Sequence, residues 1–395
     1  MNIPKHFNIL IVSDVIFPDE EAGSGRVTWE LSRNLARRGY QIVILTRGQK
    51  ELPENEKKEG IDIWRFQNNF FKCRKIFRHL VDLYHFDVIC FHHPFSALGV
   101  LTSGKGGKIP SVYFFYSPWH EEYQIRSQDL RRGYLRGEIG TALRKYFENR
   151  ILGKSAWVIV LSNFMKEKLK DWHKFPQEKI KVVPGGVDLE RFKPTAKREI
   201  IRDKLNLPEN KFILLTVRNL VSRMGLENLI MAIKNLVNRY PDILLVIGGK
   251  GYLENRLKEI VIELNLGRWV HFAGLIPDEL LPAYYQTADI FILPTKTLEG
   301  FGLITLEALA CGTPVLATPI GANIEILEKF EKGLLFKGIE PKDIALGIRE
   351  LLDHKDRYAD LRERCRKFIE ENYSWDKFTD GVEKIFYELK PQIHF

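Results

Sequence analysis

Residues 294–318, PTKTLEGFGLITLEALACGTPVLAT, decide the fold of this chain. The apolar run at 289–293 comes directly before them and is short enough for a buried strand. A polar turn leads to the glycine loop at 300–302, and good helix formers follow at 303–311. Because a second apolar run follows at 314–317, the pattern predicts strand, glycine loop, helix and strand, which is one βαβ unit of a parallel sheet.

The glycine loop of this unit predicts an anion site. Glycines let a ligand approach the backbone closely, and a helix start offers unpaired N–H groups at the positive end of its dipole. Glu299 stands in the loop and Glu307 in the helix, and carboxylates accept hydrogen bonds from sugar or ribose hydroxyls. Singly, these features are typical of surface glutamates and tight turns. Together they favour a phosphate flanked by diols, which is the layout of a nucleotide-sugar.

These residues also resemble a known family. EGFG at 299–302, EALACG at 307–312 and PVLAT at 314–318 are similar to the core motif of the retaining family-4 glycosyltransferases, which have the GT-B fold and are related to glycogen and sucrose-phosphate synthases. The resemblance implies two Rossmann-like, doubly wound α/β domains that face a cleft. The implied parts are an acceptor-binding domain at 1–185, a nucleotide-sugar-binding domain at 186–373, and a C-terminal helix at 374–395 that packs back on the first domain.

The resemblance also implies the residues that hold the donor. Family members have an Arg, and then a Lys before a glycine, on the donor diphosphate. Arg218 takes the first place, whereas Met224 stands before the glycine and Arg223 precedes it. Arg clamps phosphate with two hydrogen bonds, so Arg223 is a plausible replacement; without the resemblance, Arg218 is more typical of a structural ion pair. The implied catalytic residues are Glu299, Arg218 and Arg223, and the implied donor-binding residues are Gly300, Phe301, Gly302, Leu303 and Glu307.

A similar pattern opens the chain. Gly23 and Gly25 precede a helical pattern at 27–38, between predicted strands at 7–12 and 41–46. Such a glycine pair occurs in the loops of many doubly wound domains. The resemblance implies that this one faces the donor phosphates, so Gly23 and Gly25 are donor-binding candidates.

Tyr116 and His120 are the remaining donor-binding candidates. Many family members have a histidine that meets the donor sugar at the place of Tyr116, and His120 lies four residues further on. Considered alone, His120 is more typical of a solvated loop histidine. His92 and His93 follow another predicted strand, and a tandem pair without a third ligand favours a structural interpretation over a metal site.

The charge of the chain is unevenly distributed. Its length of 395 residues favours two domains, and residues 1–185 hold 30 Lys and Arg against 20 Asp and Glu, which accounts for the net charge of +9. This asymmetry favours an anionic partner: nucleic acid, a membrane surface or a phosphorylated acceptor. The four cysteines form no C-x-x-C pair, which favours reduced thiols and argues against a zinc or disulfide framework.

Two basic stretches concentrate this charge. Residues 126–150 are predicted to form one basic amphipathic helix, and residues 70–78 are basic and aromatic without acids. Both could lie on an anionic membrane, where each cation contributes ~1 kcal/mol. The alternative is a solvated helix face with ordinary core aromatics.

We therefore expect a hexosyltransferase-type enzyme that moves a sugar from a nucleotide-sugar to the hydroxyl of a sugar or lipid-linked acceptor, with retained anomeric configuration. We expect no cofactor and no metal, since no Asp-x-Asp pair is placed to hold an ion beside phosphates. We expect no nucleic-acid partner. No apolar run approaches the ~18 residues of a membrane span, so a cytoplasmic location is expected, with peripheral contact on the inner membrane face left open. The alternatives are a nucleotide-sugar epimerase of the same fold, a glycan phosphorylase, and a non-catalytic basic binding protein.

Overall fold

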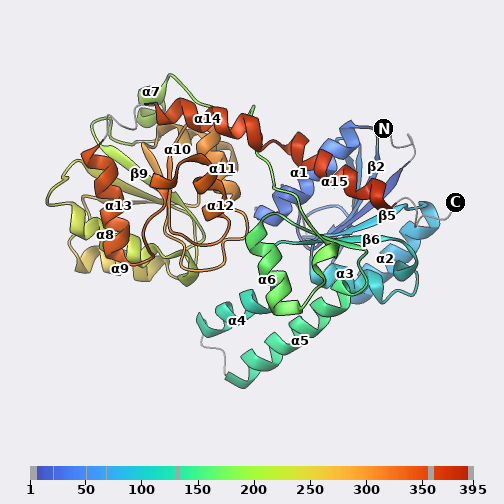
Figure 1. Cartoon of the computed structure of the whole chain (residues 1–395). Coiled ribbons are helices and arrows are strands. Elements are labelled where there is room, and N and C mark those ends of the chain that lie inside the picture. Colours follow the sequence, from blue (N-terminus) through green and yellow to red (C-terminus); the bar gives the residue numbers. More distant parts are fainter. Residues whose placement is uncertain are drawn as a thin grey trace. The chain divides into compact units, whose positions relative to one another are not determined.

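The structure is a computed structural model of the chain, and it describes residues 7–20, 22–49, 51–67, 69–129, 134–354 and 360–389. Residue contacts divide the chain into two compact units, Met1–Gly185 with Trp375–Phe395, and Gly186–Ser374. Each unit is built around one sheet (Figure 1). No helix in the described ranges combines the length and apolar character that crossing a bilayer requires.

The sheet of the first unit is parallel except at one edge. Its order is β3-β4-β2-β1-β5-β6-β7-β8, and only β3 runs antiparallel to its neighbour. Residues 9–12 of the central strand are fully buried, because helices cover both faces of such a sheet. The strands are β1 (Asn8–Ser13), β2 (Gln41–Arg47), β3 (Asn55–Lys58), β4 (Ile61–Phe66), β5 (Val88–Phe91), β6 (Ser111–Phe115), β7 (Trp157–Val160) and β8 (Ile180–Val182).

Helices pack on both faces of this sheet. Figure 1 shows α1 and α15 together on one side, and α2 and α3 on the other. The helices of the first unit are α1 (Gly23–Arg37), α2 (Phe70–Leu83), α3 (Pro94–Leu101), α4 (Trp119–Asp129), α5 (Tyr134–Leu152), α6 (Asn163–His173) and α15 (Trp375–Leu389), with 3₁₀ turns at Gly106–Lys108 and Gln177–Lys179.

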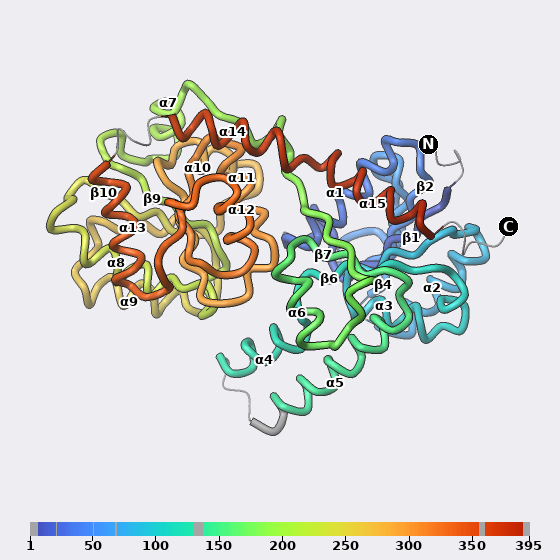
Figure 2. The backbone as a smooth tube through the Cα atoms, in the orientation of Figure 1, coloured from blue at the N-terminus to red at the C-terminus, as the bar shows by residue number. Residues whose placement is uncertain are grey.

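The last helix, α15, belongs to the first unit, although the whole second unit lies between it and the other elements of the first unit in the sequence. It lies against α1 in both Figure 1 and Figure 2. Arg38, at the end of α1, donates to Asp380 and Glu383 of α15 at 2.6 Å each. The Phe386 ring packs 6.2 Å from the Phe7 ring, between centroids. The helix therefore completes the core of the first unit, as the resemblance implied.

The sheet of the second unit is wholly parallel and has the order β11-β10-β9-β12-β13. Its strands are β9 (Phe212–Val217), β10 (Ile243–Gly248), β11 (Val270–Gly274), β12 (Ile290–Leu293) and β13 (Val315–Ala317). Its helices are α7 (Arg198–Lys204), α8 (Leu226–Leu236), α9 (Glu254–Glu263), α10 (Leu281–Thr287), α11 (Leu303–Ala310), α12 (Asn323–Phe330), α13 (Pro341–Asp353) and α14 (Leu361–Asn372), with 3₁₀ turns at Ser222–Met224, Asp278–Leu280 and Lys332–Leu334. The predicted βαβ unit is confirmed as β12, α11 and β13.

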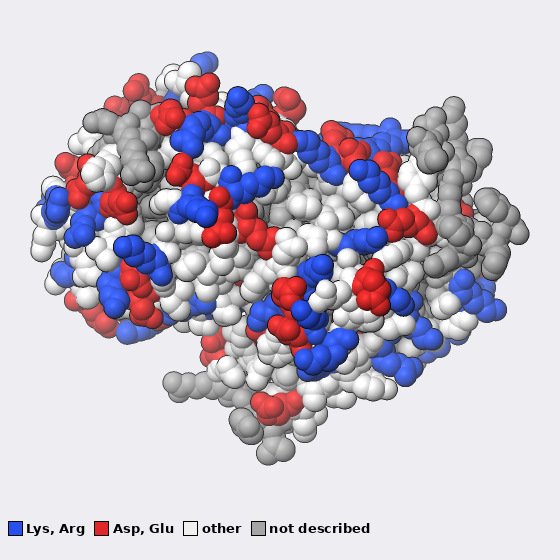
Figure 3. Space-filling view, viewed as in Figure 1, with Lys and Arg blue, Asp and Glu red and all other residues white. Residues whose placement is uncertain are grey.

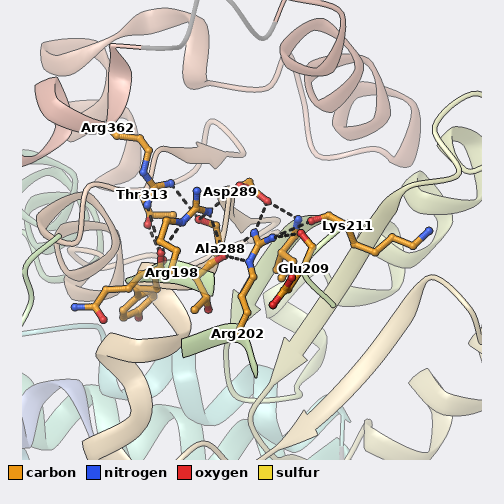
Figure 4. A network of polar contacts seen from close by, with 12 residues as sticks. Arg198, Arg202, Glu209, Lys211, Ala288, Asp289, Thr313 and Arg362 are labelled. Carbon is orange, nitrogen blue, oxygen red and sulfur yellow. Dashed lines mark hydrogen bonds and ion pairs between the residues drawn. The ribbon is translucent and has the colours of Figure 1, made fainter. Parts of the chain in front are cut away.

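Asp289, at the entrance to β12, ties helix α7 to this sheet. Its carboxylate accepts hydrogen bonds from Arg198 at 2.7 Å and from Arg202 at 2.8 Å. Arg362 of α14 donates to the neighbouring carbonyl of Ala288 at 3.1 Å, and Figure 4 shows these side chains converging on the strand entrance. The network fixes the amino end of β12, whose carboxyl end carries the glycine loop.

Two expectations about helices are wrong. Helix α1 begins at Gly23, so Gly23 and Gly25 lie in its first turn rather than in a loop before it. The segment 126–150 does not form one continuous helix, because α4, which ends at Asp129, and α5, which begins at Tyr134, pack against each other; residues 130–133 lie outside the described ranges. The sequence prediction overlooked Pro118, which directly precedes α4 and is a helix-start signal.

Two strands were not predicted. Strand β3, with the sequence NEKK, has no apolar residue and lies at an exposed antiparallel edge, where polar residues are typical. Strand β8 pairs with β7 and extends the sheet by one edge strand. Hydrophobic periodicity fails for both because one is polar and the other has only 3 residues.

Candidate functional site

The candidate site lies at the carboxyl edge of the second sheet. The chain runs from β9 to β10 on one side and later returns to β12 on the other side, so the strand order reverses between β9 and β12. In open α/β sheets, loops diverge at such a point and leave a crevice for ligands. Arg218 directly follows β9, and Glu299 lies in the loop that follows β12. The fold therefore brings both predicted residues to one crevice.

Arg218 and Glu299 form a buried ion pair in this crevice. The Arg218 Nη2 group donates to Glu299 Oε2 at 2.7 Å, and each residue is 8% exposed. Thr295 Oγ1 lies 3.1 Å from Arg218 Nη1 and 3.2 Å from the same carboxylate oxygen. The sulfur of Met224 lies 2.8 Å from Arg218 Nη2. These contacts hold the guanidinium in one orientation, and in the described residues no donor approaches Glu299 Oε1 within hydrogen-bond distance.

Arg223 holds the loop that carries Glu299. Its Nη1 group donates to the carbonyl oxygen of Leu298 at 2.9 Å, and its own carbonyl accepts from the Lys296 N–H at 2.8 Å. Leu298 has a φ of 56°, which is a costly conformation for a branched residue and needs support from its surroundings. Arg223 thus supplies both a cation and the clamp between the loops after β9 and β12.

Two glycines allow the loop backbones to meet. A Cβ on Gly249 would lie 1.8 Å from the carbonyl oxygen of Arg218, and one on Gly321 would lie 2.1 Å from that of Glu299. Both glycines have positive φ values, of 122° and 67°. Only glycine fits such close approaches. The loops after β10 and β13 therefore pack against the backbones of Arg218 and Glu299.

The glycine loop ends at the start of α11. Gly302 is the N-cap with a φ of 82°, and a Cβ there would lie 2.9 Å from Asn323 Oδ1. The N–H groups of Gly302 and Leu303 donate to no acceptor in the described part of the protein. Asn323 is fully buried, and its Nδ2 group likewise lacks a partner. Phe301 is 7% exposed and packs on the Tyr373 ring, so the loop points its backbone rather than this side chain outward.

Glu307 lies one helical turn further along α11. It is 9% exposed, and the Tyr285 hydroxyl donates to its Oε2 atom at 3.0 Å. Burial, and secondly the charge of Glu307, raise the pKa of Tyr285 well above its usual range, so this phenol stays a neutral donor. The tyrosine therefore fixes the orientation of the carboxylate, a partner that the sequence prediction missed because 22 positions separate the two residues.

A second polar cluster lies at the switch point of the first sheet, between β1 and β5. His93 Nδ1 lies 2.9 Å from Ser13 Oγ, and His93 Nε2 lies 2.9 Å from Ser24 Oγ. His92 Nδ1 lies 2.6 Å from the Tyr116 hydroxyl. Burial lowers the pKa of His92 well below its usual value, and the charge of His93 makes a smaller contribution. Burial also lowers the pKa of His93. The sequence could have indicated this site, because both histidines directly follow a predicted strand.

The remaining candidates of the first unit fall in different places. Tyr116 belongs to this cluster, and burial raises its pKa. Gly25 serves packing, because a Cβ there would lie 3.3 Å from the backbone of Ile16 and of Phe17. His120 is not a solvated loop residue: it lies in the first turn of α4 and is 1% exposed. The structure therefore offers no support for His120 as a sugar contact.

Metal-ligating side chains gather at one place among the described residues. His120, Glu148 and His173 place possible ligand atoms within 4.8 Å of one another, in the first unit. The crevice of the second unit contains no comparable group in the ranges that the structure describes. Its polar groups suit an anion and hydroxyls instead.

The two units, each a doubly wound α/β domain with polar groups at its switch point, define a protein of the two-domain Rossmann-like class. A sequence model of the family described as "Glycosyltransferase Family 4" matches residues 22–191, and one described as "Glycosyl transferases group 1" matches residues 197–385. Together they cover most of both units. The two matches and the fold identify the chain as a glycosyltransferase with the GT-B fold.

Individual relatives agree with this assignment. An uncharacterised glycosyltransferase of Methanocaldococcus jannaschii is 27% identical over 91% of this chain and 93% of its own length. A GDP-mannose-dependent phosphatidylinositol monomannoside mannosyltransferase of Mycobacterium tuberculosis is 32% identical, but the match spans 51% of this chain and 54% of that protein. Sucrose-phosphate synthase of Thermosynechococcus elongatus has the same fold, with a TM-score of 0.83 and 24% identity over 98% of this chain and 100% of that chain.

Proposed function

We propose that this glycosyltransferase moves a sugar from a nucleotide-sugar to an acceptor hydroxyl and retains the anomeric configuration. The observation that carries the proposal is the Arg218–Glu299 pair beside the unpaired amides of Gly302 and Leu303. This arrangement offers donors to a diphosphate and acceptors to hydroxyls within one crevice. The name of the mycobacterial relative, which is GDP-mannose-dependent, supports a nucleotide-sugar as donor.

The leaving diphosphate would bind at the start of α11. The amides of Gly302 and Leu303 and the guanidinium groups of Arg218 and Arg223 would stabilise the charge that develops as the sugar–phosphate bond breaks. Such preorganised donors contribute about 2.7–4 kcal/mol each in other enzymes. The contact with Glu299 fixes Arg218 before the donor arrives, so little reorientation is needed.

The two carboxylates would hold the rings on either side of the diphosphate. Glu307, oriented by Tyr285, would accept hydrogen bonds from the ribose hydroxyls. Glu299 would accept from hydroxyls of the donor sugar through Oε1, the atom that Arg218 and Thr295 leave available. The acceptor oxygen would then bond to the anomeric carbon on the face that the phosphate leaves, and the departing phosphate oxygen would take the acceptor proton.

The first unit would bind the acceptor. Its His92, His93 and Tyr116 cluster lies at the switch point of its sheet, where ligands bind in folds of this kind. Neutral imidazoles and a phenol can donate to and accept from sugar hydroxyls.

The surface charge bears on the choice of partner. The Lys and Arg side chains of the described residues lie among Asp and Glu on the face shown in Figure 3, so this face carries no continuous basic stripe of the kind that favours nucleic acid.

The donor site is tested by binding. A thermal-shift screen of UDP-, GDP- and ADP-sugars should identify a ligand that raises the unfolding midpoint. Glu307→Gln keeps an acceptor for Tyr285 but removes the charge, and it should weaken affinity for that ligand roughly 10-fold or more, since hydrogen bonds to charged groups contribute about 1.5–3 kcal/mol. Glu350→Ala, at an exposed helix position of the same unit, is the control and should bind normally. Unchanged affinity in Glu307→Gln would overturn the assignment.

The stereochemistry is tested on the released sugar. With water in place of the acceptor, the enzyme should slowly hydrolyse an α-linked donor, and proton NMR should detect the α-anomer before mutarotation. Initial formation of the β-anomer would show inversion. An epimerase would instead convert the donor sugar while leaving its bond to phosphate intact, so the same spectra distinguish the two enzyme classes.

A further inference from the structure

Three helices of the first unit enclose a cluster of His120, Glu148 and His173. His120 lies in the first turn of α4, Glu148 on α5 and His173 at the end of α6. Figure 2 shows α4 and α5 side by side, and the two helices are in contact. The side chains are 1%, 0% and 0% exposed. The cluster is therefore shielded from water, and the proposed transfer reaction does not use it.

Three of the four histidine ring nitrogens in this cluster lack hydrogen-bond partners among the described residues. Both ring nitrogens of His120 and the Nε2 atom of His173 are buried without a hydrogen bond. Each histidine nevertheless has a nitrogen near Glu148 Oε2, at 3.5 Å for His120 Nδ1 and 3.3 Å for His173 Nε2. These contacts do not have hydrogen-bond geometry. Buried polar groups are normally paired, so their lone pairs require another partner.

The two distances from Glu148 to the histidines fit a shared cation, and the possible ligand atoms of all three residues lie within 4.8 Å of one another. Zinc lies about 2.0–2.2 Å from nitrogen and oxygen ligands, so neighbouring ligands of a tetrahedral ion are about 3.3–3.5 Å apart. The nitrogen–oxygen separations of 3.5 Å and 3.3 Å in the cluster match that edge. The charge also fits, because no Lys or Arg of the described residues pairs with the buried Glu148 carboxylate.

Neighbouring groups orient two of the three side chains, His173 and Glu148, as metal ligands require. His173 Nδ1 lies 2.6 Å from Asn149 Oδ1, which can only accept, so Nδ1 carries the proton and the Nε2 lone pair faces the cluster. Glu148 accepts from the Tyr113 hydroxyl at 3.2 Å and from the Trp119 N–H at 3.2 Å. Such second partners fix ligand orientation in known metal sites.

We propose that His120, Glu148 and His173 bind a divalent transition-metal ion, with Zn²⁺ as the expected occupant. Two imidazoles and one carboxylate suit zinc, whereas Mg²⁺ and Ca²⁺ prefer ligand sets of oxygen alone. A water molecule would complete the coordination. The ion fastens α4 and α6 to α5 and has a structural role, because its three ligands come from three different helices and the proposed transfer step uses none of them.

The test measures zinc in the full chain after removal of any histidine tag. Purified protein should retain about one equivalent of zinc by mass spectrometry, and zinc added to the metal-stripped protein should raise its unfolding midpoint. His120→Ala and His173→Ala should lose the zinc. His85→Ala, which changes an exposed histidine of the same unit, should keep it. Zinc content that is negligible in the wild type, or equal in the wild type and both ligand variants, would overturn the proposal.

A second measurement covers ligand variants that fail to fold. Co²⁺ added to the metal-stripped wild-type protein should produce the strong visible absorption of a tetrahedral site, and its absence would overturn the proposal. Asn149→Ala alters an exposed position and should fold. Loss of this orienting contact should weaken zinc affinity about 10-fold or more. A hydrogen-bonded His–Glu pair without metal would instead show neither the cobalt spectrum nor an effect of zinc.

Discussion

Arg218 and Glu299 show how single residues acquire a role that neither has alone. They are 81 positions apart and share a hydrogen bond of 2.7 Å. Each charge would be costly at 8% exposure without its partner. Thr295 contacts both residues, and Arg223 holds the loop that carries Glu299. The pair is therefore held in place before any ligand binds. The same logic applies to Glu307, which Tyr285 orients.

His92 provides a prediction about pH. Burial lowers its pKa well below the usual value of about 6.5, so in the folded state it stays neutral while the unfolded chain takes up a proton. The folded state therefore loses stability as the pH falls below about 6.5, at up to about 1.4 kcal/mol per pH unit. Urea denaturation between pH 7.5 and pH 5.5 should show this slope, and His92→Asn should reduce it to the part that buried His93 contributes.

The matched control for this measurement is His85→Asn, at an exposed position of the same unit. Its slope should equal that of the wild type, because His85 is exposed and lies outside the buried histidine cluster. Equal slopes in the wild type and His92→Asn would contradict the prediction.

At the scale of elements, each site depends on where loops leave the sheet. The loops after β9 and β12 diverge at the strand reversal, and Gly249 and Gly321 let the neighbouring loops support them. Helix α11 contributes its amino end to the crevice and its buried apolar face to the core. Helix α15 has a different role, since it seals the first unit by packing on α1.

Phe378 of α15 tests that role. Its ring is 1% exposed and packs against the rings of Phe114 and Trp375. Phe378→Ala should lower the unfolding free energy of the first unit by about 3–5 kcal/mol, because it removes buried apolar contacts and leaves a cavity. Phe71→Ala, at a ring that is 74% exposed, should change stability little. A small effect of Phe378→Ala in urea denaturation would show that α15 does not complete this core.

At the scale of the whole molecule, two similar domains carry different chemistry. The second unit offers cations, amides and carboxylates at its switch point, whereas the first offers neutral histidines, hydroxyls and a phenol. The proposed function assigns the charged donor to the second unit and the hydroxyl-bearing acceptor to the first for this reason. Helix α15 belongs to the first unit although the second unit precedes it in the sequence, so the first unit is complete only when α15 has been made.

Turnover is predicted to need no catalytic metal, because arginines and amides are placed to meet the diphosphate charge in the proposed mechanism. A brief treatment with EDTA should leave the rate unchanged, and added Mg²⁺ should not raise it. Activity that is lost on chelation and regained with Mg²⁺ would contradict this prediction. Activity regained with Zn²⁺ alone would instead point to the structural ion at His120, Glu148 and His173.

The sequence by itself determined the strand–loop–helix units and the residue types at their ends. The apolar runs, the glycine loop at 300–302 and the family motif sufficed to predict both Rossmann-like domains, because these signals act over a few neighbouring residues. The motif also predicted Arg218, Glu299 and Glu307 as site residues.

Only the tertiary structure decided which distant residues meet. It paired Tyr285 with Glu307, assembled His92, His93 and Tyr116, and moved His120 from an expected loop to a buried cluster. The physical reason is that such contacts depend on strand order and helix packing, which no local pattern of residues encodes. Burial and partner geometry then set the chemistry of each group, and both are properties of the folded molecule.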